Sequence, residues 1–147
     1  MKSAYTYIAW LIALEVLVQA ASIAYGVFGM EKWVEDGHSA TKSSMESAHY
    51  AGAGGFTLHG INGEIAIVVL GIILLVVAFL SKIPRATVAA GTLLAMIVVQ
   101  VVLGLVSSAV PVLGALHGIL ALLVFAYAAM IGVRVMLAGK RSAAPVA

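Results

Sequence analysis

Four long apolar runs divide this sequence and constrain its fold more than any other feature. They cover about residues 5–28, 57–80, 86–107 and 111–133. The hydrocarbon core of a bilayer is about 30 Å thick and takes roughly 20 helical residues to cross, so each run is long enough to span it. The chain is 63% hydrophobic and only 10% charged, whereas about a quarter of an ordinary soluble domain is charged. The sequence therefore predicts an all-α membrane protein, with residues 1–147 forming a single membrane domain.

Two absences narrow the chemistry that the chain could perform. It has no cysteine, which excludes disulfides, iron–sulfur clusters, thiolate ligation of haem and covalent c-type attachment. Any cofactor must therefore be held by nitrogen or oxygen. The sequence also has no basic patch with interleaved aromatic residues, so nucleic acid is not an expected partner.

Basic residues are unevenly divided between the two ends of the four predicted spans. One end carries Lys2, Lys82, Arg85, Arg134, Lys140 and Arg141. The other end has only Lys32 and Lys42, in the loop 29–55. By the positive-inside tendency, both termini are expected in the cytoplasm and this loop outside a cell membrane. The first run is longer than a typical signal-peptide core, so it is interpreted as a span and not as a removed signal.

The two halves of the chain resemble one another. "LVQAASIAYG" in the first run aligns with "VVQVVLGLVS" in the third, which matches Gln19 with Gln100. "TLHGINGEIA" in the second run aligns with "ALHGILALLV" in the fourth, which matches His59 with His117. This pattern predicts two repeated helical hairpins packed as a four-transmembrane-helix bundle. Cofactors in such bundles sit in the core, between side chains on facing helices.

The matched histidines are the strongest candidates for a binding site. At a rise of 1.5 Å per residue, His59 and His117 both lie within about 10 Å of the outer membrane face. Pseudo-symmetry predicts that their spans are diagonal neighbours, with the imidazoles facing one another, as two axial ligands of a planar metal macrocycle do. The expected cofactor is haem b. Structural or proton-relay histidines remain an alternative, as does zinc or copper, although a tetrahedral site would need further ligands.

Small and amide residues accompany these histidines. Gly60, Gly63 and Gly118 remove bulk beside the imidazoles, as a flat macrocycle requires, although small residues also let membrane helices approach closely. Gln19 and Gln100 could each donate to a bound ligand or to a neighbouring helix, and the sequence leaves both interpretations open.

Two carboxyl groups within the apolar runs need an explanation, because a carboxylate in hydrocarbon must pair, face water or stay protonated. Glu64 could bond an imidazole, carry protons or contact a quinone head group. Glu15 could contact a partner subunit, or could be a neutral carboxyl bonded to a carbonyl. In the outer loop, a Ser/Thr signal before "MESAH" predicts a short interfacial helix. Its histidines, His38 and His49, are either solvated or part of a lid over the site.

The segment "VVQVVLGLVSSAVPVLGALHGILALLVFAYA", residues 98–128, resembles the third and fourth spans of the haem A synthase family. The shared features are a Gln followed by Leu-Gly, an outer turn with Pro, and a ligand His opening an Ala/Leu-rich helix. The resemblance implies one four-helix half of that family's fold, with histidines at the outer ends of the second and fourth spans. It places the haem ligands at His59 and His117.

The chain departs from that family at the catalytic motif Glu-x-x-His-Arg. The positions of the acid and the arginine are Phe56 and Gly60 here. Glu46-Ser-Ala-His49 has the same spacing, but it lies upstream and lacks the arginine, so we interpret it as a coincidence. Glu64 follows His59 by five residues, about 140° around an ideal helix, and is not an obvious substitute for the missing acid.

These observations predict a bis-histidine, b-type membrane cytochrome that acts in electron transport or haem handling near the outer face. Its expected partners are the lipid bilayer and either another membrane protein or a second copy of this chain, with a quinone as a further candidate. Two other classes stay open: a non-haem accessory subunit of a larger membrane complex, and a small haem-modifying enzyme of haem A synthase type. The sequence does not decide whether the chain is an enzyme.

Overall fold

The structure, a computed structural model, describes residues 1–47 and 49–142, and nearly all of these are helical. In chain order the elements are α1 (Lys2–Glu35), α2 (Lys42–Ser47), α3 (Ala53–Ile61), the π-helix η1 (Asn62–Ala66), α4 (Ile67–Ser81), α5 (Ala86–Ser107) and α6 (Val112–Ser142). No strand occurs in these described residues. Because α3, η1 and α4 follow one another without a break, they form one long rod. The described chain thus contains four helices long and apolar enough to cross a membrane, which makes it a multi-pass membrane protein.

The helices extend beyond the apolar runs that predict them. The third span agrees with prediction at both ends, but α1 continues past residue 28 to Glu35 and α6 continues past residue 133 to Ser142. A helix needs apolar residues only inside the bilayer, so polar turns can prolong it into water. At the end of α1, an ion pair between Lys32 and Asp36 and a bond from the Asp36 N–H to the Lys32 carbonyl close the last turn. The outer loop is correspondingly shorter than predicted.

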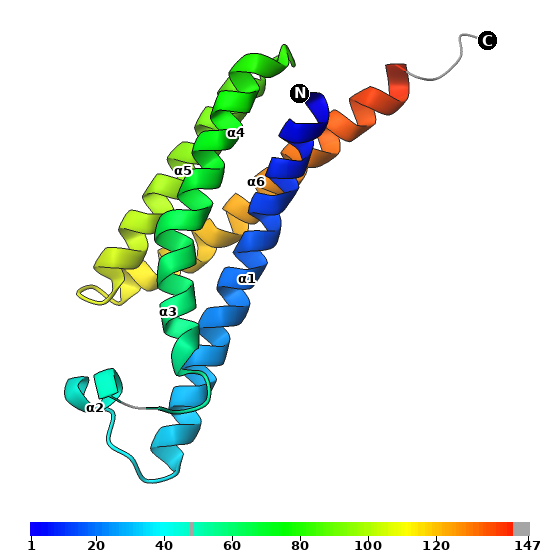
Figure 1. Ribbon diagram of the computed structural model, residues 1–147. Coiled ribbons are helices and arrows are strands. Elements are labelled where there is room, and N and C mark those ends of the chain that lie inside the picture. The colour runs from blue at the N-terminus through cyan, green and yellow to red at the C-terminus, as the bar shows by residue number, and fades with distance from the viewer. Residues whose placement is uncertain (48, 143–147) are drawn as a thin grey trace.

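The four spans form a ring in which each packs against two neighbours. Helix α1 contacts α3–α4 and α6, and α5 contacts α4 and α6. The second and fourth spans therefore lie on opposite corners of the bundle, as the repeat predicts. Figure 1 shows both described ends of the chain and the α4–α5 turn at one end of the molecule, with the outer loop and the α5–α6 turn at the other. The side chains of Lys140 and Arg141, two of the basic residues at that end of the spans, lie outside the described residues, as does the tail 143–147.

The tightly packed core occupies the half of the bundle nearer the termini. Its largest fully buried side chains are Tyr5, Ile12, Leu74, Leu93, Ile97 and Val124. The Tyr5 hydroxyl donates a hydrogen bond of 3.1 Å to the Ala86 carbonyl, which joins the first and third spans at that end. Many large apolar side chains elsewhere are exposed, as expected of surfaces that face lipid. The outer half of the bundle is therefore free to hold a cavity.

Glycines set the close approach of α3 to α1 in this outer half. A Cβ at Gly55 would clash with the carbonyl oxygen of Ser22, and Gly52 has a φ of +100°, which side chains rarely adopt. The ring of Phe56 packs on Gly26, where an added Cβ would lie 3.1 Å from it. This contact brings the second span against α1 one turn before His59.

The outer loop folds around the end of α1. The predicted short helix is present as α2, and the Thr41 side-chain oxygen accepts a hydrogen bond of 3.2 Å from the Ser44 N–H at its start. The indole of Trp33 stacks on His38 and on Tyr50, with ring centroids 4.9 and 5.4 Å apart. The loop is thus anchored to α1.

Candidate functional site

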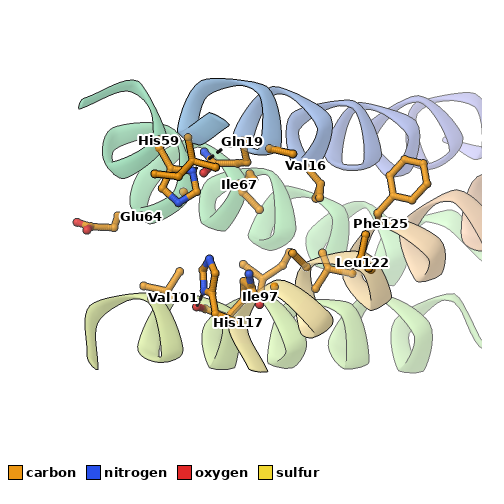
Figure 2. A pocket seen from close by; sticks show the side chains of 18 of the residues that line it. Val16, Gln19, His59, Glu64, Ile67, Ile97, Val101, His117, Leu122 and Phe125 are labelled. Atoms are coloured by element: carbon orange, nitrogen blue, oxygen red, sulfur yellow. Dashed lines mark hydrogen bonds between the residues drawn. The ribbon is translucent and has the colours of Figure 1, made fainter. Parts of the chain in front are cut away.

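Two histidines face one another across the outer half of the bundle. His59 projects from α3 and His117 from α6, with ring centroids 6.2 Å apart and ring planes at 63°. Figure 2 shows both rings turned toward the space between the helices. The sequence repeat thus predicts the placement of this pair.

The same hydrogen bond holds each histidine. Nδ1 of His59 lies 3.1 Å from the Gln19 carbonyl oxygen, and Nδ1 of His117 lies 3.0 Å from the Gln100 carbonyl oxygen. A carbonyl oxygen can only accept, so Nδ1 carries the proton in both rings and donates it. In the neutral imidazole, Nε2 is then an unprotonated acceptor with a free lone pair.

This arrangement suits a metal between the rings. Histidines that ligate metals almost always donate their other ring N–H to a carbonyl or carboxylate, which fixes the tautomer and the ring orientation. A metal held about 2 Å from the nitrogen of each ring separates the two centroids by about 6 Å. The observed separation is 6.2 Å.

A cavity of about 500 Å³ surrounds the two rings and is lined by all four spans. This volume lies within the range of about 300–1,000 Å³ that is usual for small-molecule and cofactor sites. The lining includes every predicted site residue: Gln19, His59, Gly60, Gly63, Gln100, His117 and Gly118. Its inner wall is apolar, built from Val16, Ile67, Ile97, Val124 and Phe125.

The glycines of the lining fall into two kinds. A Cβ at Gly60 or Gly118, the residues directly after the two histidines, would meet no atom within 4 Å. A Cβ at Gly63 would lie 3.2 Å from the Gln19 side-chain oxygen, and one at Gly104 would lie 3.1 Å from the His117 ring. Gly60 and Gly118 therefore leave open space beside each imidazole, whereas Gly63 and Gly104 allow close packing. Gly104 is not among the site residues that the repeat predicts, because the matching position in the first hairpin is Ile23.

The matched glutamines contribute through their backbones as well as their side chains. Their carbonyls hold the histidines, and their amides line the cavity. Gln19 Nε2 and Gln100 Oε1 are buried and have no hydrogen-bond partner in the described part of the chain. A buried polar atom left unpaired costs about 1–3 kcal/mol. The two amides are therefore available to a bound ligand or to water.

A π-helical turn lies between His59 and Glu64. In η1, the Ile67 N–H donates to the Asn62 carbonyl five residues earlier, which inserts an extra residue into the turn. The rotation of 100° per residue used in the sequence analysis therefore does not apply here, and the expected 140° offset is wrong. Glu64 lines the same cavity as His59. Figure 2 shows its carboxylate at the edge of the cavity, directed away from the rings.

Glu15 has a partner outside the cavity. The Asn62 side-chain amide donates to its carboxylate over 2.8 Å, and Asn62 is itself buried. Neither residue is among those lining the cavity. Glu15 therefore accepts a hydrogen bond from an amide, whereas a neutral carboxyl bonded to a carbonyl would donate one.

The described part of the outer loop does not contribute to the lining of the histidine cavity. No described residue between Asp36 and Gly52 is among the lining residues, so a lid over the site stays a prediction. The Nδ1 of His38 bonds to the Trp33 carbonyl at 3.0 Å, and His49 is exposed. The side chain of Glu46 lies outside the described residues. Within the described chain, no three His, Cys, Asp or Glu residues gather as a metal site, so a tetrahedral zinc site would lack ligands there.

Fold and site together define an all-α, multi-pass membrane protein with a paired-histidine cavity in the half of the bundle nearer the α5–α6 turn. In comparisons with known proteins, no family model, curated protein or solved structure matches this chain. Its function must therefore be inferred from its own residues.

Proposed function

We propose that this protein is a b-type membrane cytochrome in which His59 and His117 ligate one haem b. The observation that carries this proposal is the matched pair of hydrogen bonds from Nδ1 to the Gln19 and Gln100 carbonyls. They leave both Nε2 atoms free on rings whose centroids are 6.2 Å apart. Bound there, haem would supply a one-electron redox centre.

The other lining residues fit a flat, largely apolar group. Gly60 and Gly118 leave room beside each imidazole, and the inner wall is hydrocarbon. The unpaired amide atoms of Gln19 and Gln100 could bond polar atoms at the edge of the ligand. The chain has no cysteine, so attachment would be non-covalent.

The location and the partners belong to the same proposal. The distribution of Lys and Arg supports a cell membrane with both termini in the cytoplasm and the site near the outer face. The role is electron transfer or haem handling, with another membrane protein, a second copy of this chain or a quinone as the partner. Leu17 and Leu122 line the cavity and are also exposed, at 51% and 69%, so a partner within the membrane could approach the cofactor closely.

Optical spectra of the purified protein, oxidised and reduced, test this function. The expected result is one haem b with the low-spin spectrum of two nitrogen ligands. His59→Ala or His117→Ala should abolish or convert that spectrum, because each removes one ligand. His38→Ala is the matched control and should leave it unchanged, because His38 stacks on Trp33 away from the cavity. A colourless protein from cells supplied with ample haem contradicts the proposal and favours a non-haem accessory subunit.

A further inference from the structure

The helices that pack most closely beside the histidine cavity belong to the same hairpin. In the first hairpin, the Phe56 ring packs on Gly26. In the second, a Cβ at Gly104 would lie 3.1 Å from the His117 ring. Figure 2 shows α1 and the second span on one side of the cavity and α5 and α6 on the other. The cavity can therefore open where one hairpin meets the other.

The line of contact between α1 and α6, here called the α1–α6 seam, widens along the bundle. Near the termini it is closed, because Trp10 packs on Gly132, where an added Cβ would lie 2.6 Å from the indole nitrogen. Leu17 lies about two helical turns after Trp10 on the same face of α1, yet it is 51% exposed. Gly118 lies about four turns before Gly132 on the same face of α6, and a Cβ there would meet no atom within 4 Å. The seam is thus open where Leu17 and Gly118 line the cavity.

The open part of the seam lies at the depth of lipid acyl chains. Leu122, another exposed lining residue, is ten residues into α6, which begins at Val112. At 1.5 Å per residue it is about 15 Å from that end of the helix, near the middle of a hydrocarbon core about 30 Å thick. The exposed lining residues of α1 and α6 are Leu17, Ala20, Gly118 and Leu122, and none has a polar side chain. A ligand that passes this opening therefore leaves into hydrocarbon and not into water.

The end of the cavity nearer the α5–α6 turn has a different wall. On their helices, His59 and His117 are the lining residues closest to that end, as are Ile23 on α1 and Leu105 on α5. No described residue of the outer loop or of the turn 108–111 is in the lining. The paired rings thus stand between the rest of the cavity and the water beyond the turn.

We propose that the α1–α6 seam is the route by which the histidine cavity exchanges its ligand with the hydrocarbon of the bilayer. This inference rests on the proposed function, which makes the ligand haem b, a largely apolar group that dissolves in membranes. Leu17 and Leu122 border the opening, so their bulk sets how fast a flat ligand binds and leaves. The contact of Trp10 with Gly132 limits the opening on the side of the termini.

Release of haem from the wild-type protein tests this route. The haem-loaded protein is placed in dimyristoyl phosphatidylcholine vesicles, an excess of a water-soluble haem-binding apoprotein is added outside, and loss of the two-nitrogen spectrum is followed. Release through the seam needs fluid acyl chains. On cooling through the temperature at which the chains freeze, the rate should drop abruptly by at least about tenfold, the effect of ~1.4 kcal/mol on a barrier. Transfer from protein-free vesicles, measured in parallel, gives the contribution of the step from lipid to water.

A substitution at the opening gives a second test, in fluid vesicles. Leu17→Trp adds bulk and should slow both binding and release of haem, each by at least about tenfold. A residue that only held the ligand would change release and leave binding nearly unaltered. Leu14→Trp is the matched control and should keep both rates, because Leu14 is also exposed on α1 but does not line the cavity. If Leu17→Trp fails to fold, Leu17→Ala decides, because it removes bulk and should speed both steps.

The outcomes separate the two proposals. A release rate that changes smoothly through the freezing of the chains overturns the route, because release straight into water does not need fluid lipid. Unaltered rates in the Leu17 variants, or a change in release alone, also overturn it. Each of these results leaves the cytochrome proposal standing. A wild-type protein without the two-nitrogen spectrum overturns the proposed function, and the route for haem falls with it.

Discussion

At the scale of single residues, the site depends on which atom each residue uses. In the sequence, the side-chain amides make the matched glutamines candidates for the site. The hydrogen bonds that orient His59 and His117, however, are accepted by the backbone carbonyls of Gln19 and Gln100. A carbonyl can be supplied by any residue, so these two bonds alone do not require glutamine. The side-chain amides, each with a buried atom unpaired in the described chain, are the part that a ligand would require.

Filling the open space beside an imidazole should block cofactor binding without unfolding the protein. Leu in place of Gly118 meets no protein atom at its Cβ and gains about 1 kcal/mol in helix propensity, but its side chain would occupy the position of a flat ligand. We expect Gly118→Leu to weaken haem binding at least about tenfold, equivalent to ~1.4 kcal/mol, measured by haem titration of the apoprotein. Gly91→Leu is the matched control, because Gly91 also has open space but lies outside the cavity. Equal affinity in both variants would contradict the placement of the ligand.

At the scale of helices, the sequence predicts the spans but not their irregularities. Apolar runs locate all four spans because hydrocarbon thickness fixes their length. The apolar runs underestimate the lengths of α1 and α6, since the part of a helix that lies in water does not need apolar residues. The π-turn η1 escapes prediction for another reason: periodicity assumes a constant rotation per residue, and a single inserted residue changes the face of everything on one side of it. For that reason the sequence predicts His59 as a lining residue but places Glu64 on another face.

Shortening η1 by one residue should be tolerated, unlike the same change in a regular helix. Ile65 is 59% exposed, and its deletion can convert the π-turn into an α-turn while the flanking helices keep their faces. We expect haem binding to survive this deletion, measured by the low-spin spectrum. Val98, 50% exposed on α5, is the matched control. Its deletion should rotate Gln100 away from His117 and abolish the spectrum. Loss of the low-spin spectrum in both deletion variants would show that the extra residue of η1 cannot be removed without disturbing the site.

At the scale of the whole molecule, duplication explains why so much of the site can be predicted. Each hairpin brings one histidine and one glutamine to the cavity, and two similar hairpins place equivalent residues on opposite corners of the ring. The diagonal arrangement and the common end of the termini follow from four spans with short connections. Orientation in the membrane does not follow from packing, because the bundle is the same whichever way it is inserted. It remains a prediction from Lys and Arg.

Labelling from the two sides of the membrane tests that orientation. The chain has no cysteine, so single cysteines at Ser43 and Ser142 provide unambiguous probes. An impermeant thiol reagent added to intact cells should label Ser43→Cys, in the outer loop. Ser142→Cys should react only after the membrane is opened, because the end of α6 is expected to face the cytoplasm. Labelling of both cysteines in intact cells would contradict the four-span arrangement. Labelling of Ser142→Cys but not Ser43→Cys in intact cells would show that the chain is inserted the other way round.

The likeness to haem A synthases proposed from residues 98–128 raises a question about the whole protein, because a cavity that binds haem need not modify it. Oxidising a methyl group of haem requires groups that manage protons beside the reacting edge. At the position where that family carries its glutamate, this chain has Phe56, whose ring packs on Gly26 and can neither accept nor donate a proton. Glu64 lines the cavity, but its carboxylate is directed away from the rings (Figure 2).

We therefore expect no conversion of haem o to haem A. In a strain that lacks haem A synthase, expression of this protein should leave haem A undetectable by chromatography of the extracted haems, with an authentic synthase as the positive control. The result also tests two carboxyl groups, Glu64 and Glu46. If haem A forms and disappears with Glu64→Gln, the π-turn has supplied a replacement acid and the protein is an enzyme. If it disappears instead with Glu46→Ala, the reacting haem is held by the outer loop at His49, and His59 is not its ligand.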